Sequence, residues 1–204
     1  MRSKLFVPGA RPELFDKAMA GAADVLSFDL EDSVPEAGKA AARAQVAGFL
    51  SRPGVADSGR LLIVRSNGTD TPHFAADVAA VALQSVWLLN LPKVETVTQV
   101  HAAVASLERA EAANGVTRPI GLLLNIETPC GLRMAPALAA AHPRVAGLQL
   151  GLGDLFAPHG IARTAANVHA TLFALRMAAA EAGVFACDGA FPDVGDDDGF
   201  RAEA

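Results

Sequence analysis

Seven short, almost continuously apolar runs recur along the chain, and longer alanine-rich stretches separate them. Continuous rather than alternating apolar runs are typical of strands that are buried on both faces of a parallel sheet. The longer stretches have helical length, and Gly115 and Gly183 stand where two of these helices should end. We predict strands at residues 4–7, 25–30, 61–65, 86–91, 120–126, 145–151 and 184–187, and helices at residues 11–22, 36–50, 73–83, 95–114, 131–141 and 164–182.

The strict alternation of strand and helix limits the fold to two arrangements. Consecutive parallel strands are joined by right-handed crossovers, so the chain forms either an open, doubly wound sheet or a closed barrel. A barrel of eight units typically needs about 250 residues. The chain has 204 residues, so a barrel would lack one βα unit, and residues 193–204 have the pattern of a further helix that has only begun.

Composition and charge argue against several classes of protein. The net charge is −5 and no basic run occurs, which argues against nucleic-acid binding. No apolar run approaches the roughly 18 residues of a membrane span, and Pro8 interrupts the apolar stretch near the start. The cysteines, Cys130 and Cys187, are widely spaced and are interpreted as reduced thiols. We therefore expect a soluble, cytoplasmic protein.

Polar residues gather at the ends of the predicted strands. Active sites in parallel α/β proteins lie at the carboxyl ends of strands, so these residues should meet at one edge of the sheet. Such a cluster is not needed for folding and therefore predicts a functional site. Its members are Asp29, Glu31, Asp32, Arg65, Lys93, Glu127, Asp154 and Asp188.

Glu127 and Asp154 follow consecutive predicted strands. Neighbouring parallel strands lie about 4.8 Å apart, so two carboxylates at matching heights could reach one small cation. Mg²⁺ is usually bound by one or two carboxylates and keeps several waters. The alternative is that each acid caps the helix that follows it.

Arg65 ends an otherwise apolar strand, where an arginine needs a carboxylate partner. It could form an internal ion pair with the acids Asp29, Glu31 and Asp32, or it could bind a substrate carboxylate or enolate oxygen. The two roles are compatible. Side chains alternate along a strand, so the three acids cannot all point inward.

Six motifs together resemble a known family, although each is weak alone. Their order and spacing are similar to those of the citrate lyase β-subunit family, which includes the malyl-CoA, citramalyl-CoA and β-methylmalyl-CoA lyases. The motifs are residues 2–9 (RSKLFVPG), 29–34 (DLEDSV), 65–67 (RSN), 91–93 (LPK), 127–128 (ET) and 153–155 (GDL).

The resemblance implies a (β/α)₈ TIM barrel formed by a single domain over residues 1–204, C-terminally incomplete because the eighth βα unit is missing. It also implies Mg²⁺-dependent cleavage of a 3-hydroxyacyl-CoA of the malyl, citramalyl or citryl type to an acyl-CoA and a 2-oxo acid. The family forms homotrimers or homohexamers, so we expect a homo-oligomer.

By the same resemblance, Glu127 and Asp154 match the Mg²⁺ ligands, and Glu127 thereby contributes to substrate binding. Arg65 matches the arginine that contacts the 2-oxo acid portion and the developing enolate. Lys17 matches, more loosely, a basic residue near the CoA phosphates.

Glu31 and Asp32 match an acidic pair that supports the metal-bound waters, and we predict a catalytic role for both. The family continues into an eighth strand and a C-terminal part, which in the malyl-CoA lyases supplies an aspartate proposed as the acid/base, and neither lies in this sequence. Three alternatives follow: a citrate lyase β subunit acting on a carrier-protein thioester, a truncated non-catalytic paralogue, and an aldolase of free 2-oxo acids. The blocks at residues 5–8 and 29–32 favour the thioester branch over the last.

Overall fold

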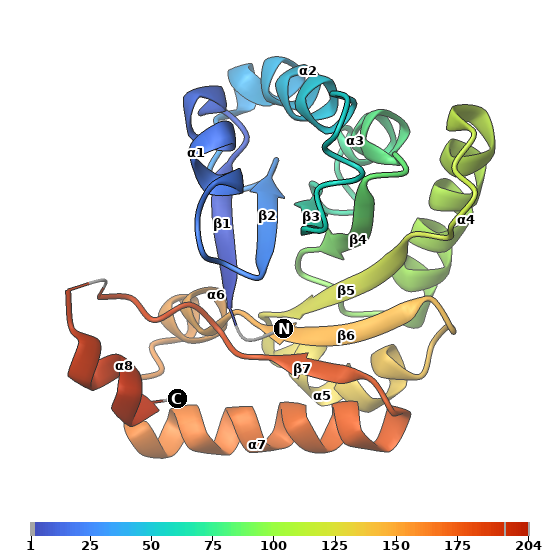
Figure 1. Ribbon diagram of the computed structural model, residues 1–204. Helices are drawn as coiled ribbons and strands as arrows, with labels where there is room; N and C mark the ends of the chain where they lie inside the picture. Colours follow the sequence, from blue (N-terminus) through green and yellow to red (C-terminus); the bar gives the residue numbers. More distant parts are fainter. Residues whose placement is uncertain (1–2, 194, 204) are drawn as a thin grey trace.

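A computed structural model of the chain describes residues 3–193 and 195–203. Seven parallel strands form one sheet in which every strand pairs with the strand that follows it in the sequence. The sheet curves into an open barrel, which confirms the predicted TIM-barrel architecture without an eighth unit (Figure 1). The strands are β1 (Lys4–Pro8), β2 (Val25–Asp29), β3 (Leu61–Arg65), β4 (Val86–Leu91), β5 (Gly121–Ile126), β6 (Val145–Leu150) and β7 (Phe185–Cys187).

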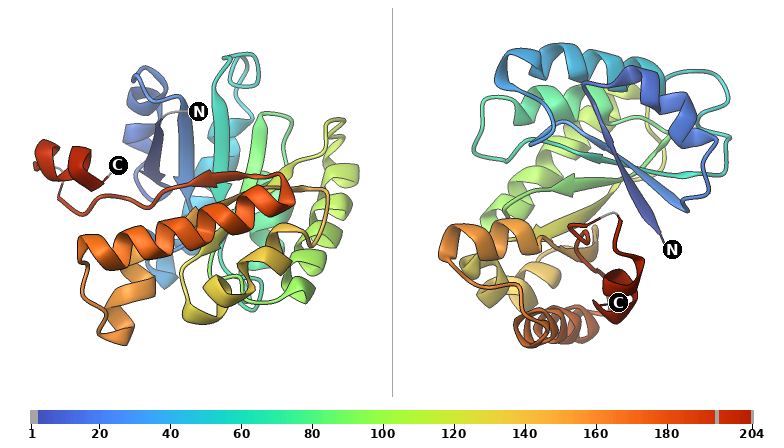
Figure 2. Two further views of the ribbon diagram at one scale, coloured as in Figure 1. Left: turned by 90° about the horizontal axis from the view of Figure 1, so that it is seen from below. Right: turned by 90° about the vertical axis from the view of Figure 1, so that its left-hand side faces the viewer.

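The longer helices lie on the outer side of the curved sheet (Figure 1). After β7 the chain leaves the barrel and ends in α8, which lies to one side of the strands (Figure 2). The α-helices are α1 (Phe15–Met19), α2 (Lys39–Leu50), α3 (Phe74–Val81), α4 (Val97–Asn114), α5 (Pro129–Ala139), α6 (Leu152–Phe156), α7 (Ala165–Ala182) and α8 (Asp197–Glu203); the 3₁₀ turns are η1 (Pro12–Leu14), η2 (Glu36–Gly38) and η3 (Ala157–His159).

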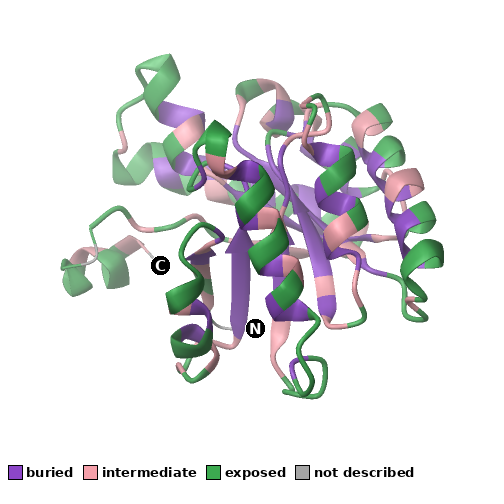
Figure 3. Cartoon of the chain, turned by 90° about the horizontal axis from the view of Figure 1, so that it is seen from above, coloured by how far each residue is buried: buried purple, intermediate pink, exposed green. Residues whose placement is uncertain are grey.

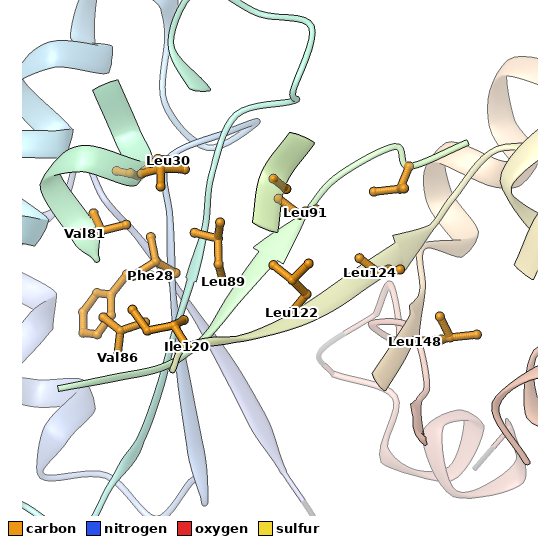
Figure 4. Packing of buried hydrophobic residues seen from close by; sticks show 14 of the residues in the cluster. Phe28, Leu30, Val81, Val86, Leu89, Leu91, Ile120, Leu122, Leu124 and Leu148 are labelled. Atoms are coloured by element: carbon orange, nitrogen blue, oxygen red, sulfur yellow. The ribbon is translucent and has the colours of Figure 1, made fainter. Parts of the chain in front are cut away.

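The main core fills the space between the sheet and the helices. Alternate strand residues such as Phe28, Leu89 and Leu122 point outward into it and are fully buried (Figure 4). Burial is concentrated in the strands and on the sheet-facing sides of the helices (Figure 3). This one-sided burial is what the apolar runs and alanine-rich stretches predict.

A second, smaller core closes the interior of the barrel. Val25, Ile63, Leu88 and Leu123 occupy the inward positions near the amino ends of their strands. Trp87 and Phe185, with ring centroids 6.0 Å apart, pack against this cluster. The inward positions nearer the carboxyl ends are polar instead, so this apolar layer forms a base beneath the polar residues.

Several helix ends follow from the local sequence. Thr96 caps α4 by accepting a hydrogen bond from the Gln99 backbone N–H, and the Gln99 side chain completes a capping box. Gly115 and Gly183 end α4 and α7 in the left-handed conformation, with φ of 68° and 69°. Both predicted helix ends are therefore confirmed.

Some predicted boundaries are wrong. The helix predicted over residues 11–22 is instead a 3₁₀ turn followed by a five-residue helix that ends at Met19, shortly before Gly21. The helix expected to begin near the end of the chain is present as α8. Arg2, Val194 and Ala204 lie in two of the predicted segments and are outside the described residues.

No helix in the described part of the chain is long and apolar enough to cross a membrane.

Candidate active site

A cavity of about 570 Å³ opens at the carboxyl ends of the strands. Residues from β1, β2, β3, β5 and β6 line it, together with the segments that follow these strands and β7. This is the edge at which the sequence predicts a site. The polar lining residues are Asp29, Asp32, Ser33, Arg65, Asn125, Glu127, Gln149, Asp154 and Arg163.

Arg65 is bound by three carboxylates at the mouth of the cavity. Its Nε and Nη2 donate to the two oxygens of Asp29 at 2.7 and 2.8 Å. Its Nη1 lies 2.8 Å from Glu31 and 3.4 Å from Asp32. Burial alone would lower the pKa of Arg65, but the hydrogen bonds and charge of Asp29 outweigh it and hold the pKa above its ordinary value. The predicted internal ion pair is therefore present.

Asp29 organises the loop that follows β2. Burial would raise its pKa, but the hydrogen bonds and charge of Arg65 hold that pKa below the ordinary value. Its carboxylate also accepts from the backbone N–H groups of Glu31 and Ser33, at 2.9 and 3.0 Å. These contacts fix the loop that carries Glu31 and Asp32, and Asp32 lines the cavity.

The ammonium of Lys93 lies among acids that follow two strands, β2 and β6. Its Nζ lies 2.6 Å from Glu31, 3.4 Å from Asp32 and 3.9 Å from Asp154. Burial would lower its pKa, but the hydrogen bond to Glu31 and the nearby carboxylates hold the pKa above its ordinary value. Glu31 itself has a raised pKa, chiefly because it is buried.

Glu127 is 3% exposed at the end of β5. Its Oε1 accepts from the Lys93 backbone N–H at 2.8 Å, and its Oε2 accepts from Asn125 at 3.2 Å. Burial, with the charges of Glu31 and Asp154, raises the pKa of Glu127 to about 7.

Neither Glu127 nor Asp154 acts as a helix cap. The N-cap of α5 is Thr128, whose hydroxyl accepts from the Gly131 backbone N–H. Asp154 lies in the first turn of α6, whose N-cap is Gly151, and its side chain is 45% exposed toward the cavity. Both carboxylates are therefore available for another role.

The donor set fits a single Mg²⁺ ion. Glu127 is held by two hydrogen bonds, and a Cβ at Gly151 would come within 2.5 Å of its Oε2. The absence of that Cβ leaves room for the carboxylate. Within residues 3–193 and 195–203, no group of three or more His, Cys, Asp or Glu side chains is placed to hold a metal. Mg²⁺ suits such a site, because it needs only one or two carboxylates and takes its other ligands from water and substrate.

The structure brings five of the six predicted site residues together: Glu31, Asp32, Arg65, Glu127 and Asp154. Lys17 is not among them, since it lies on the exposed side of α1 and outside the cavity lining. The sequence shows Lys93 at a strand end but does not reveal that it bridges the acids.

Lys4 is a second residue that pattern alone does not identify. It occupies an inward position on β1, where its ammonium donates to Gln149 and lies 4.4 Å from the centroid of the Phe6 ring. Phe6 and Gln149 both line the cavity. Burial lowers the pKa of Lys4 to about 7. The alternation of strand side chains could have indicated its inward position.

Residues 2–204 match the family described as HpcH/HpaI aldolase/citrate lyase. The chain belongs to this family. As a citrate lyase β-like member, it is an enzyme of the lyase type, which confirms the predicted resemblance.

Among curated relatives, this family member is similar to the L-malyl-CoA/β-methylmalyl-CoA lyase of Cereibacter sphaeroides. The two are 35% identical over 225 residues, which cover 100% of this chain and 70% of the relative.

Two solved structures of Mycobacterium tuberculosis proteins are also similar. The citrate lyase β subunit complexed with oxaloacetate and magnesium is 32% identical with a TM-score of 0.78, covering 98% of this chain and 83% of that one. The protein CitE in complex with magnesium, acetoacetate and coenzyme A is 31% identical with a TM-score of 0.76, covering 98% and 69%.

Proposed function

We propose that this chain is a Mg²⁺-dependent carbon–carbon lyase. It cleaves a 3-hydroxyacyl-CoA of the malyl, citramalyl or citryl type into an acyl-CoA and a 2-oxo acid. The observation that carries the proposal is one shared cavity: the Arg65 guanidinium, held by Asp29, lines it together with Glu127 and Asp154. The magnesium, oxo acid and coenzyme A bound in the solved relatives support this class of ligand.

Glu127 and Asp154 are the residues that would hold Mg²⁺. When bound, the ion supplies a Lewis acid that lowers the pKa of the substrate hydroxyl and chelates the 2-oxo acid. Burial disfavours the charged form of Glu127 while no cation lies nearby. A cation bound beside Glu127 would offset this penalty, because an opposite charge favours the carboxylate.

Arg65 offsets the negative charge that develops during cleavage. The bond between the carbinol carbon and the α-carbon of the thioester breaks, and its electron pair becomes the enolate of the acyl fragment. A guanidinium fixed in advance by Asp29 stabilises that charge without reorganising. Arg65 and Glu127 thus contact the substrate in this proposal.

Glu31 and Asp32 hold the water molecules of the site, and one of the two carboxylates takes the hydroxyl proton. The α-carbon of the enolate then takes up one proton, which gives the acyl-CoA. The Asp32 side chain is 53% exposed, so water can reach it, whereas Glu31 is fixed between Arg65 and Lys93. Lys17, exposed on α1, would contact the CoA phosphates. A homotrimer or homohexamer remains the predicted assembly.

The similarity to a citrate lyase β subunit favours a second candidate, in which the thioester is carried by a carrier protein rather than by CoA. The chemistry at Arg65 and the two carboxylates would be the same.

The test is release of 2-oxo acid from malyl-CoA, citramalyl-CoA and citryl-CoA, each with Mg²⁺ and with EDTA. EDTA-sensitive release from one thioester supports the proposal and names the substrate. Asp57→Asn is the control, because Asp57 is an exposed acid outside the cavity lining. Release of free CoA without a 2-oxo acid would contradict carbon–carbon cleavage. If none of the three CoA thioesters releases a 2-oxo acid but a carrier-protein thioester does, the second candidate is favoured.

A further inference from the structure

We propose that Lys93 is a positioning residue that aligns the metal-binding carboxylates and acts as a resident cation among the acids until a divalent ion arrives. The inference rests on the proposed function, since it assumes that Glu127 and Asp154 bind the metal. It concerns a residue to which neither the motif pattern nor the comparisons give a role.

The backbone of Lys93 is strained. Its φ is 50°, which makes it the one non-glycine residue with positive φ in the described ranges. A side chain with a Cβ is disfavoured in this left-handed region, and such outliers gather at functional sites. The preceding Pro92 follows the last residue of β4, Leu91, and leads the chain into this turn.

In this turn the backbone and the side chain of Lys93 contact acids that follow two different strands. The backbone N–H of Lys93 donates to Glu127 Oε1 at 2.8 Å, on the β5 side. Its ammonium extends to the β2 side and bonds Glu31 Oε1 at 2.6 Å. Lys93 thereby fixes the relative placement of Glu127 and Glu31.

The charge around Lys93 explains why a cation is needed there. Five acids gather at this edge of the sheet, and the cations of the cluster are Arg65 and Lys93; the acids are Asp29, Glu31, Asp32, Glu127 and Asp154. Asp29 and Arg65 largely satisfy each other. Arg65 also contacts Glu31 and Asp32, whereas the ammonium of Lys93 lies near these two acids and Asp154 as well.

Lys93 and the metal must share Asp154. The ammonium lies 3.9 Å from Asp154 Oδ2, and the metal would take the same carboxylate. The positive charge of Lys93 opposes a divalent cation, while its hydrogen bonds hold the carboxylates ready. Lys93 therefore lowers the affinity for metal and raises the precision with which the bound metal and Glu31 are placed.

A purely structural role makes the opposite prediction for metal affinity. If Lys93 only supported the fold, its loss would loosen the carboxylates and weaken metal binding. If it is a resident cation, removing its positive charge from beside Asp154 strengthens metal binding by about fivefold to tenfold. The sign of the change separates the two roles.

The experiment measures Mn²⁺ binding to EDTA-stripped protein by calorimetry, and turnover at saturating metal, for Lys93→Met, Lys93→Gln and Lys93→Arg. The neutral variants keep the backbone N–H to Glu127, so we expect Mn²⁺ to bind about fivefold to tenfold more tightly. We expect kcat to fall at least about tenfold because Glu31 keeps Arg65 but loses its second partner, and its position is no longer fixed. Lys93→Arg keeps the charge and should retain wild-type metal affinity. Arg176→Met, an exposed cation on α7, is the matched control.

Unchanged or weaker Mn²⁺ binding in both neutral variants, with their melting temperatures unchanged, would overturn the inference. If Lys93→Met does not fold, the polar and neutral variant Lys93→Gln shows whether Mn²⁺ affinity rises or falls. If the wild-type protein binds no Mn²⁺ and cleaves no thioester, the proposed function fails instead. If wild type binds Mn²⁺ and cleaves a thioester, and the Lys93 variants do so with the same affinity and rate, only the role of Lys93 is overturned.

Discussion

Asp29 and Arg65 occupy paired positions on β2 and β3, and two nitrogens of the guanidinium donate to the two oxygens of the carboxylate. The distances are 2.7 and 2.8 Å, and both side chains are largely buried. A bidentate pair fixes the plane of the guanidinium as well as its position. The direction in which Arg65 faces the cavity therefore depends on Asp29.

Asp29→Asn should reduce both stability and activity. Asparagine keeps the shape of the side chain but loses the charge and one acceptor, while Glu31 and Asp32 still contact Arg65. We expect the free energy of unfolding to fall by about 1–3 kcal/mol and KM to rise, as measured by urea denaturation and steady-state kinetics. Asp57→Asn, an exposed substitution, is the control for both. Wild-type stability in Asp29→Asn would show that the pair contributes no net stability.

Arg65→Lys should lose most of the activity while retaining the positive charge. An ammonium is a point charge and cannot make the two parallel bonds to Asp29, so the charge shifts within the cavity. We expect kcat/KM to fall at least about 100-fold, with the far-ultraviolet circular dichroism unchanged. Turnover within a factor of two of wild type would exclude a role for the guanidinium fork.

Gly151→Ala should damage the metal site directly. The added Cβ would lie 2.5 Å from Glu127 Oε2 and 2.6 Å from Glu127 Cβ, so the carboxylate must move. We expect Mg²⁺ affinity to fall at least about tenfold, measured by calorimetry. Gly153→Ala is a close control, because nothing lies within 4 Å of a Cβ at that position. Equal losses in both variants would mean that the effect does not come from contact with Glu127.

Glu127→Gln should stabilise the metal-free protein and remove its response to Mg²⁺. Burial raises the pKa of Glu127 from 4.5 to about 7, so the folded state binds more protons than the unfolded state between these values. Stability therefore falls as the pH rises through this window, and the buried charge is unfavourable at pH 8. We expect glutamine to raise the unfolding free energy at pH 8 by about 1–3 kcal/mol.

The measurement for Glu127→Gln is the melting temperature at pH 8 with EDTA and with Mg²⁺. Wild type should melt at a higher temperature with Mg²⁺, because a ligand that binds only the folded state stabilises it. With EDTA the variant should melt at a higher temperature than wild type, and Mg²⁺ should raise its melting temperature little. A full Mg²⁺ response in Glu127→Gln would remove this residue from the metal site.

The architecture can be predicted from the sequence because strands buried on both faces of a parallel sheet consist of nearly continuous apolar residues. The runs around Val25, Ile63 and Leu122 are apolar on both faces, and the structure places them between the outer core and the apolar base inside the barrel. By contrast, α6 has five residues, too few for a helical period to appear.

The site could be predicted only in part. Parallel topology brings the ends of all strands to one edge, so the acids and Arg65 can be placed together without a structure. Whether Lys93 bridges them depends on a φ of 50° after Pro92 and on the pairing of β4 with β5. That information lies in three-dimensional geometry and in no local pattern.

Lys4 gives a prediction about pH that concerns stability rather than turnover. Burial lowers its pKa from 10.5 to about 7, and no carboxylate lies within ion-pair distance of it in the part of the chain described. Between pH 7 and pH 10 the unfolded state binds a proton that the folded state does not, so stability rises with pH. We expect this rise to be roughly 2 kcal/mol and to disappear in Lys4→Met.

The difference in melting temperature between wild type and Lys4→Met, followed from pH 6 to pH 10, isolates this effect from the neighbouring thiol of Cys187. Burial raises the pKa of that thiol, and both proteins retain it. Methionine removes the ammonium and its bond to Gln149 but fills similar volume. The variant should therefore be more stable than wild type at pH 6, and the two should converge toward pH 10. A constant difference across this range would mean that Lys4 is charged throughout and is solvated in the folded state.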